Sequence, residues 1–188
     1  MGKVVLGTTI SLDGFVNDRN GSVAALYPDL AGWRETKPGK ESIQDTGAVI
    51  MGRHSFDMAE DPDWFAGNYE NQVPIFVLTH EPPPPEKHPK ETDDLHFTFV
   101  TDGIASAVAQ AKAAAGDKDV NVIGAPSMAQ QCLRAGLADE LHVDIMPLLL
   151  GGGLRLFEDT GAKLIQLERI NVMELPGGRT HLKFRILE

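Results

Sequence analysis

Hydrophobic residues along the chain gather in short runs rich in β-branched side chains, with polar or turn residues on either side. Apolar runs of about four to eight residues are typical of strands. Several runs are apolar at consecutive positions, which indicates strands covered on both faces of a sheet. The pattern predicts strands at residues 3–10, 48–51, 74–78, 97–100, 120–123 and 140–146.

Apolar residues between these runs recur every three or four positions, which predicts helices that each bury one face. Strands that alternate with helices are typical of an α/β protein. The helical stripes are formed by Ile104, Val108, Ala111 and Ala115, by Met128, Cys132 and Leu133, and by Leu30 and Trp33.

The C-terminal end of the chain has a different pattern. Residues 181–186 read HLKFRI, and this alternation of polar and apolar side chains predicts a half-buried antiparallel strand. Pro176-Gly177-Gly178 comes before it and predicts a hairpin turn from another strand near residues 164–174. The whole order predicts an α/β fold whose mixed, mainly parallel central sheet has helices on both faces and a C-terminal antiparallel hairpin.

Composition narrows the class of protein. The 188 residues suit one domain with a sizeable core, so we treat residues 1–188 as a single domain. The net charge of −10 argues against nucleic acid or an anionic membrane as the main partner, because both favour a basic face. Cys132 is the one cysteine, which excludes an internal disulfide, and a buried, unreactive thiol is expected there. With no signal peptide and no apolar run of roughly 20 residues, we expect a cytoplasmic protein.

Residues 49–55, VIMGRHS, run from an apolar strand through Gly52 into a predicted helix start. Free backbone N–H groups at a helix start attract anions, and glycine lets a phosphate approach the backbone. Arg53 supplies a forked cation, His54 supplies a second donor, and Ser55 can cap the helix or bond a phosphate oxygen. This turn therefore has two interpretations, an anion site and a capped helix with an exposed arginine.

Residues 120–133, VNVIGAPSMAQQCL, repeat the arrangement, with Gly124-Ala125 after an apolar strand and Pro126 in the first helical turn. Turns that follow neighbouring parallel strands open at the same carboxyl edge of a sheet, where α/β proteins bind ligands. The pair of turns therefore predicts a ligand with two or more phosphates, such as a dinucleotide. The sequence contains neither the Rossmann fingerprint after its first strand nor a P-loop.

Four segments together resemble a known family. MGRHSFDM and VIGAPSMAQQCL are similar to the two cofactor-binding strand–turn–helix units of dihydrofolate reductase. ISLDGFV and AGLADELHVDIMPLLLGGGLRLF are closer to a sister group, the reductase domain of bifunctional riboflavin-biosynthesis deaminase-reductases and its stand-alone relatives. The resemblance covers about residues 3–186. It implies a dihydrofolate reductase-like three-layer fold that binds NADPH and transfers hydride to a small heterocycle.

The resemblance also implies a set of cofactor contacts. The first turn would hold cofactor phosphates, residues 79–80 would lie by the adenosine ribose and its 2′-phosphate, and the second turn would surround the pyrophosphate and nicotinamide side. Arg53 and His80 favour NADPH over NADH, because a 2′-phosphate attracts cations. With Thr9 near the nicotinamide carboxamide, the implied contacts are Thr9, Gly52, Arg53, His54, Ser55, Thr79, His80, Gly124, Ala125, Pro126, Ser127 and Met128.

Two acids are candidate catalytic residues. Asp13, in SLDG, follows the first predicted strand and is expected to face the cleft, although Asp-Gly is also a common turn. Asp29, in YPDLAGW, resembles the carboxylate with which dihydrofolate reductases bind the pterin, and it is also a good helix cap. A catalytic carboxylate needs a raised pKa in an apolar pocket, which Trp33 or Phe15 could supply. We expect no metal site, and we treat as surface residues the histidines without metal-ligand spacing, His88, His96, His142 and His181.

We predict an NADPH-dependent reductase of a small heterocycle such as a pterin or a pyrimidine. The riboflavin-pathway reductases carry a glutamate just before their paired glycines, where it meets the substrate, and here that position is Ile123. The difference keeps two alternatives open, a catalytically inactive nucleotide-binding protein of the same fold and a relative that binds flavin. Because relatives are often dimers, we also expect a homodimer, with residues 135–147 at the contact.

Overall fold

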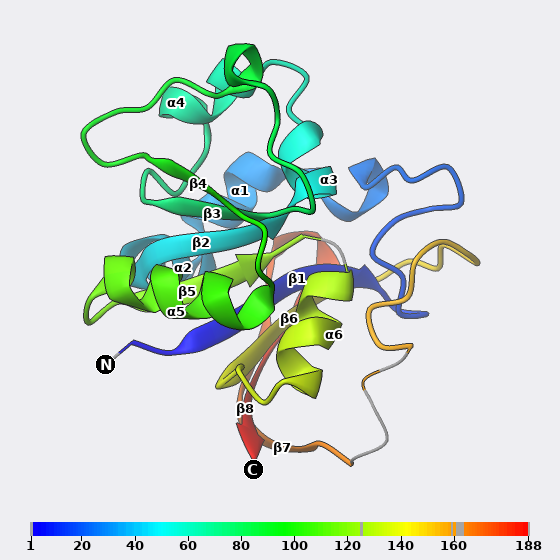
Figure 1. The fold of residues 1–188 in the computed structure, drawn as a ribbon. Coiled ribbons are helices and arrows are strands. Elements are labelled where there is room, and N and C mark those ends of the chain that lie inside the picture. Colours follow the sequence, from blue (N-terminus) through cyan, green and yellow to red (C-terminus); the bar gives the residue numbers. More distant parts are fainter. Residues whose placement is uncertain (1, 125, 159, 161–163, 188) are drawn as a thin grey trace.

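The strands form one sheet and are β1 (Val4–Ser11), β2 (Thr46–Gly52), β3 (Ile75–Leu78), β4 (Phe97–Val100), β5 (Asp119–Ile123), β6 (Glu140–Met146), β7 (Gln166–Glu174) and β8 (Thr180–Leu187). The computed structural model describes residues 2–124, 126–158, 160 and 164–187. The strand order is β4-β3-β2-β5-β1-β6-β8-β7 (Figure 1). In this spatial order, the strands β4, β3, β2, β5, β1 and β6 run parallel to one another. Strand β8 is antiparallel to both of its neighbours, β6 and β7.

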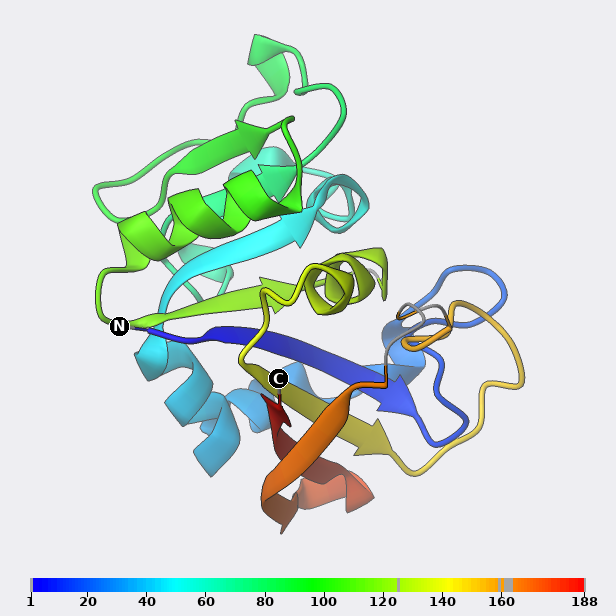
Figure 2. The same cartoon turned by 60° about the horizontal axis from the view of Figure 1, so that its bottom comes forward.

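Helices cover both faces of this sheet. Figures 1 and 2 show α5 (Ile104–Ala115) and α6 (Pro126–Arg134) on one face, and α1 (Leu30–Glu35) and α2 (Lys37–Asp45) on the other. This arrangement confirms the predicted α/β fold with its C-terminal hairpin. No helix in the described part of the chain is long and apolar enough to cross a membrane. The shorter helices are η1 (Ala24–Leu26), α3 (Arg53–Asp57), η2 (Pro62–Trp64), α4 (Phe65–Asn68), η3 (Pro85–Lys87) and η4 (Pro176–Gly178).

Alternate residues of β2 enter two apolar clusters, one on each face of the sheet. Ala48 and Ile50 pack into the cluster beneath α5 and α6, whereas Val49 and Met51 pack into an aromatic cluster on the other face. All four side chains are almost completely buried. The prediction of strands that are apolar on both faces is therefore confirmed for β2.

The predicted helices at residues 104–115 and 128–133 are present as α5 and α6. In α6, Cys132 is fully buried, and burial raises the pKa of its thiol to about 12. A thiol with such a pKa stays protonated and is a poor nucleophile. The expectation of a buried, unreactive cysteine is confirmed.

The apolar pattern does not predict α2, because most of its side chains are polar and Pro38-Gly39 resembles a turn. Thr36 starts this helix. Its Oγ1 accepts a hydrogen bond from Gly39 N at 3.2 Å and donates one to Trp33 O at 2.6 Å. Pro38 lies in the first turn, where its missing N–H is no loss. Capping by Thr36, rather than an apolar stripe, marks this helix in the sequence.

The hairpin between β7 and β8 forms at residues 176–178 as predicted. The polar side of β8 is nevertheless covered by other parts of the chain at His181, whereas Arg185 is exposed. His181 is 5% exposed, so the expectation that it lies on the surface is wrong. His142 is also half-buried, whereas His88 and His96 are exposed. The alternation in the sequence is real, but at His181 the polar side of this strand also packs against protein.

Residues 135–147 include β6, which lies inside the sheet. It is hydrogen-bonded to β1 on one side and to β8 on the other. A strand paired on both edges has no free backbone groups to offer another chain. The contact between subunits expected for residues 135–147 stays a prediction, and in β6 it would use side chains and not the backbone edges.

Candidate functional site

A cavity of about 330 Å³ lies on the face of the sheet that α1 and α2 cover. It runs from the helix starts that follow β2 and β5 to the buried polar side of β6 and β8. Its walls include Ser55 and Gly124 at one end, Thr9 between them, and Asp144 and His181 at the other end. This is the position at which parallel α/β sheets commonly bind ligands.

The two predicted turns meet at this cavity. Because β2 and β5 are neighbouring parallel strands, Gly52 at the end of β2 and Gly124 just after β5 lie at the same edge of the sheet. Gly124 has a φ of +101°, and a Cβ added there would lie 2.2 Å from Ser55 Oγ. The Ser55 hydroxyl does not cap α3, whose cap is Gly52. The prediction that both turns open at one edge is confirmed, and a side chain at Gly124 would fill the space between them.

Arg53 lies at the start of α3 and joins it to the segment after β3. Its Nε donates to both carboxylate oxygens of Asp57 at 2.8 Å, and its Nη1 donates to Glu81 O at 3.0 Å. Thr79 Oγ1 donates to the same Glu81 carbonyl at 2.7 Å. Arg53 and Thr79 thus meet at the Glu81 carbonyl, and His80, which lies between Thr79 and Glu81 in the sequence, is exposed.

The predicted cofactor residues divide into three groups. Met128 is buried beneath Gly52, where a Cβ would lie 3.4 Å from Met128 Cγ, so this side chain supports the first turn from below. Ala125 lies outside the described residues. Those that line the cavity are Thr9, His54, Ser55, Gly124 and Pro126, and those that do not are Gly52, Arg53, Thr79, His80, Ser127 and Met128.

Asp13 lies away from the cavity walls and binds a neighbouring loop. Its carboxylate accepts hydrogen bonds from Ser11 Oγ at 2.5 Å, Leu150 N at 3.1 Å and Gly151 N at 2.8 Å. The hydrogen bond from Ser11 is the main cause that lowers the pKa of Asp13, and the backbone N–H groups act in the same direction. A carboxyl group with a lowered pKa is ionised at neutral pH and holds no proton to donate as an acid catalyst. The hydrogen bonds of Asp13 indicate a structural role in the loop.

Asp29 caps α1. It accepts a hydrogen bond from Gly32 N at 2.7 Å, and it is exposed. Like Asp13, it is not among the residues that line the cavity. The catalytic role predicted for these two acids stays a prediction without support from their positions.

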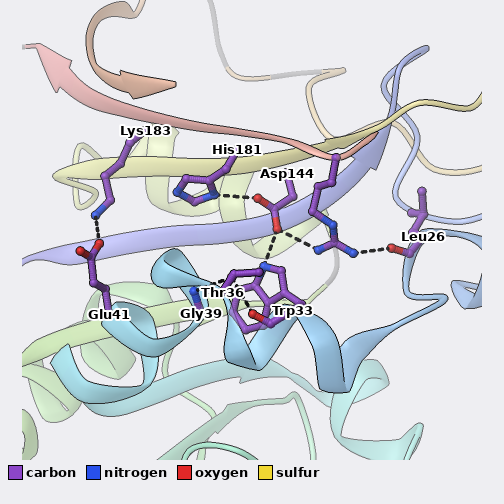
Figure 3. A network of polar contacts seen from close by, with 9 residues as sticks. Leu26, Trp33, Thr36, Gly39, Glu41, Asp144, His181 and Lys183 are labelled. Carbon is purple, nitrogen blue, oxygen red and sulfur yellow. Dashed lines mark hydrogen bonds and ion pairs between the residues drawn. The ribbon is translucent and has the colours of Figure 1, made fainter. Parts of the chain in front are cut away.

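A different acid, Asp144, lies at the cavity and was missed by the sequence interpretation. The residue is 5% exposed, and its carboxylate accepts three hydrogen bonds, from His181 Nδ1 at 2.6 Å, Arg179 Nη1 at 2.9 Å and Trp33 Nε1 at 2.8 Å (Figure 3). Arg179 also donates to Leu26 O at 3.2 Å. We refer to Asp144, Arg179, His181 and Trp33 as the β6–β8 network. It joins two strands to α1 and η1, which cover the cavity.

Strand register explains how the network forms. Asp144 on β6 is directly opposite His181 on β8, so the two side chains lie on the same face of the sheet. Arg179 precedes His181 by two residues and therefore shares that face. The signal in the sequence was present in two places, ELHVDIM and RTHLKF, because each alternates polar with apolar residues. Only their pairing shows that the polar positions face one another.

Glu140 and His142 continue the polar side of β6. Glu140 contacts Lys3 Nζ at 2.8 Å and His142 Nε2 at 2.9 Å. Burial alone would raise the pKa of Glu140, but the hydrogen bonds from Lys3 and His142 outweigh it and the pKa is lowered. Burial lowers the pKa of His142 to about 4, against the opposing effect of Glu140. His142, which lines the cavity, is therefore neutral at pH 7.

Tyr27 and Thr9 line the cavity beside the β6–β8 network. Although Tyr27 is 37% exposed as a residue, burial of its hydroxyl raises the pKa, a hydrogen bond with Thr9 opposes that rise, and the charge of Asp144 adds to it. Thr9 itself is 4% exposed. A neutral phenol and a buried hydroxyl thus lie next to the carboxylate.

Unpaired polar atoms gather around the same cavity. Within the described ranges, the buried side-chain atoms without a hydrogen-bond partner are Arg34 Nε, Asn71 Oδ1, Asn121 Oδ1 and His181 Nε2. Asn71, Asn121 and His181 all line the cavity. An unpaired buried polar group costs about 1–3 kcal/mol, so these walls favour a polar ligand. No group of three or more metal-ligating side chains occurs among the described residues.

Comparisons with solved structures agree with the fold. The chain is similar to a candidate riboflavin biosynthesis protein from Shewanella sp. PV-4, with a TM-score of 0.77, 21% identity, and complete coverage of both chains. It is also similar to a diaminohydroxyphosphoribosylaminopyrimidine deaminase/5-amino-6-(5-phosphoribosylamino)uracil reductase from Thermotoga maritima, with a TM-score of 0.68 and 15% identity. That likeness covers 99% of this chain and 57% of the Thermotoga chain. At these identities the structures show a shared fold, the dihydrofolate reductase-like fold that the sequence predicted.

Comparisons of sequence identify the family. The chain is similar to the uncharacterized proteins YyaP and YwjB of Bacillus subtilis, with 26% identity over 186 residues and 24% over 159 residues. The alignments cover 94% and 84% of this chain, and 90% and 83% of the relatives. The sequence profile of the RibD C-terminal domain matches residues 2–178. A match over nearly the whole chain shows that this protein belongs to the RibD C-terminal domain family.

Proposed function

We propose that this protein is an NADPH-dependent reductase that transfers hydride to a small heterocyclic substrate, such as a pterin or a pyrimidine. The observation that carries the proposal is a single cavity that reaches from Ser55 and Gly124 to Asp144 and His181. One end offers open backbone at two strand–turn–helix units, and the other end offers buried polar groups. Membership of the RibD C-terminal domain family supports a reductase, as does the shared fold with the Thermotoga protein named as a deaminase and 5-amino-6-(5-phosphoribosylamino)uracil reductase.

The residues at the two turns fit the phosphates of a dinucleotide. Gly124 is exposed and has no side chain, and a Cβ there would collide with Ser55 Oγ. Backbone that is held open in this way at the start of α6 can approach a phosphate closely. Gly52, His54 and Ser55 would hold the phosphates from the side of α3, and Pro126 and Ser127 from the side of α6.

The remaining predicted cofactor contacts are assigned from their positions relative to these two turns. Arg53 and Thr79 meet at the Glu81 carbonyl, and together with the neighbouring His80 they would hold the ribose and its 2′-phosphate. Thr9, deeper in the cavity, would lie near the nicotinamide carboxamide. Bound NADPH would supply the hydride. The chain itself would orient the two rings, exclude water beneath α1, and supply the proton.

Titration of the purified protein with NADPH, NADH and FMN, followed by fluorescence, tests the proposal. We expect NADPH to bind with the highest affinity of the three. Absence of NADPH binding at millimolar concentration would reject a reductase of this type. Binding of FMN alone would favour the alternative of a flavin-binding relative.

Arg53→Ala tests the assignment of the 2′-phosphate. A hydrogen bond to a charged group contributes about 1.5–3 kcal/mol, so the affinity for NADPH should fall roughly tenfold or more. The affinity for NADH, which lacks this phosphate, should change little. Arg169→Ala on the exposed strand β7 is the matched control and should change neither affinity. Equal losses for NADPH and NADH would contradict the assignment.

One observation favours a second candidate function, a nucleotide-binding protein without catalysis. Ile123 lines the cavity at the position where the riboflavin-pathway reductases carry a glutamate. This candidate predicts that NADPH binds but that its absorbance does not decay with any member of a panel of pterins and pyrimidines. Decay with one of these compounds would exclude it.

A further inference from the structure

His181 carries a polar atom that the protein does not satisfy. Its Nδ1 is 2.6 Å from Asp144 Oδ1, whereas no other described residue hydrogen-bonds its Nε2. The side chain is 6% exposed and lies in the wall of the cavity. Since an unpaired buried group costs about 1–3 kcal/mol, a polar ligand that pairs with Nε2 would recover free energy on binding.

Asp144 determines which nitrogen of His181 carries a fixed proton. Its carboxylate already accepts hydrogen bonds from Arg179 and Trp33, and an ionised carboxylate can only accept. Nδ1 of His181 must therefore be the N–H group that faces Asp144, which leaves Nε2 free to give or take a proton. A carboxylate behind an imidazole holds its tautomer and orientation and stabilises the imidazolium form.

Three other titratable groups at the cavity, His142, Glu70 and Tyr27, are less suited to supply a proton. Burial lowers the pKa of His142 to about 4, so it carries no excess proton at pH 7, and its Nε2 is 2.9 Å from Glu140. Glu70 is paired with Arg34 at 2.7 Å. Burial raises the pKa of the Tyr27 hydroxyl, which makes it a weaker acid.

We infer that His181 is the catalytic acid of the proposed reduction, binding a substrate nitrogen through Nε2, with Asp144 as its positioning residue. The inference rests on the proposed function and narrows the substrate to a heterocycle with a reducible C=N bond. Bound NADPH would supply the hydride for the new C–H bond, and the π electrons of C=N would pass to nitrogen. The Nε2–H bond of the His181 imidazolium breaks as the new N–H bond forms. His181 is left as a neutral imidazole whose Nδ1–H still faces Asp144.

Nuclear magnetic resonance of the ¹⁵N-labelled wild-type protein tests the contact without any variant. Long-range ¹H–¹⁵N spectra report the protonation and hydrogen bonding of each imidazole nitrogen. We would add dihydrofolate, dihydrobiopterin and aminopyrimidines, each with and without NADPH. At least one of these probes should shift the Nε2 resonance of His181 strongly and leave its Nδ1 resonance nearly unchanged. If no probe moves the Nε2 resonance, the inference is overturned.

Substitutions then test the proton transfer with the probe that binds. His181→Gln places an amide near the position of Nε2, whereas His181→Asn leaves that position empty. Both should lower kcat by roughly 10²–10⁴-fold, the usual contribution of a general acid. The Gln variant should keep a KM close to that of the wild type, and the Asn variant should raise it. His96→Asn, at an exposed histidine in the segment before β4, is the matched control and should leave both constants unchanged.

The outcomes separate the inference from the proposed function. NADPH affinity, measured by fluorescence, should be the same in the wild type and both His181 variants. If the wild type binds and oxidises NADPH while the His181 variants keep its kcat, the role of His181 is overturned and the reductase stands. If the wild type does not bind NADPH, the proposed function falls, whatever the His181 resonances show. If a variant does not fold, the wild-type resonance titration decides.

Discussion

The two faces of β6 and β8 come from the same two strands, yet they have opposite chemistry. Leu141, Val143 and Phe184 point into the apolar cluster beneath α5 and α6. On the other face, Asp144 and His181 form the buried β6–β8 network beneath α1. Alternation in these strands therefore does not separate a buried face from an exposed one. It separates a face held by packing from a face held by directed hydrogen bonds.

The two faces should respond differently to substitution. On the apolar face, each lost methylene removes its own share of buried area, and neighbouring side chains are still satisfied. On the polar face, the loss of one partner leaves the others buried and unpaired. The polar face is therefore the more costly to disturb and the more useful for binding, because its groups are already oriented.

The largest effect is expected for Asp144→Ala. The substitution leaves Arg179 buried without its partner, and breaking a buried ion pair costs about 3–5 kcal/mol of unfolding free energy. Urea denaturation measures this loss. The double variant Asp144→Leu, Arg179→Met removes both charges and should be less destabilised than Asp144→Ala. A double variant less stable than the single one would show that packing, not charge, dominates this face.

A smaller effect is expected from pH, through His142. Burial lowers the folded-state pKa of His142 to about 4 from its ordinary value of 6.5. Between these values the unfolded chain binds the proton and the folded chain does not, so stability falls as pH decreases from 6.5 towards 4. Unfolding by urea at several pH values in this range should show the decline.

Two variants separate His142 from other causes of the decline. The stability of His142→Asn should change less with pH than that of the wild type between pH 6.5 and 4. His96→Asn, an exposed histidine, should retain the wild-type slope. The lowered pKa of Glu140 places its own loss of stabilisation below its ordinary value of 4.5, outside most of this range. An unchanged slope in His142→Asn would assign the decline to another group.

The smallest effect is expected for Thr36→Ala, which acts on the helices that cover the polar face. Thr36 caps α2 and also binds Trp33 O, so its loss loosens the junction with α1 (Figure 3). Loss of a helix cap costs about 1 kcal/mol. Thermal unfolding measures it, with the exposed Thr98→Ala on β4 as the control. A loss equal to that of the control would mean that the cap contributes nothing here.

Local patterns in the sequence were sufficient for most of the fold. Each strand from β1 to β6 overlaps a predicted apolar run, because short runs of apolar side chains are typical of strands in a covered sheet. The turns at Gly52 and Gly124 were also recognisable, since a glycine between a strand and a helix is a local feature. The polar helix α2 was missed, because its stability depends on a cap and on its neighbours more than on its own stripe.

The candidate site, like the fold, was predicted from the sequence only in part. By itself the sequence determined the order of strands and helices, and with it the edge of the sheet where Ser55 and Gly124 meet. Only the tertiary structure decided that Asp144 and His181, 37 positions apart, face one another, and that Trp33 covers them. The reason is physical: strand pairing and register between distant segments place these groups together, and their burial follows from what packs above them. Asp13 and Asp29 have equally suggestive local patterns, but the fold directs them to a loop and a helix cap.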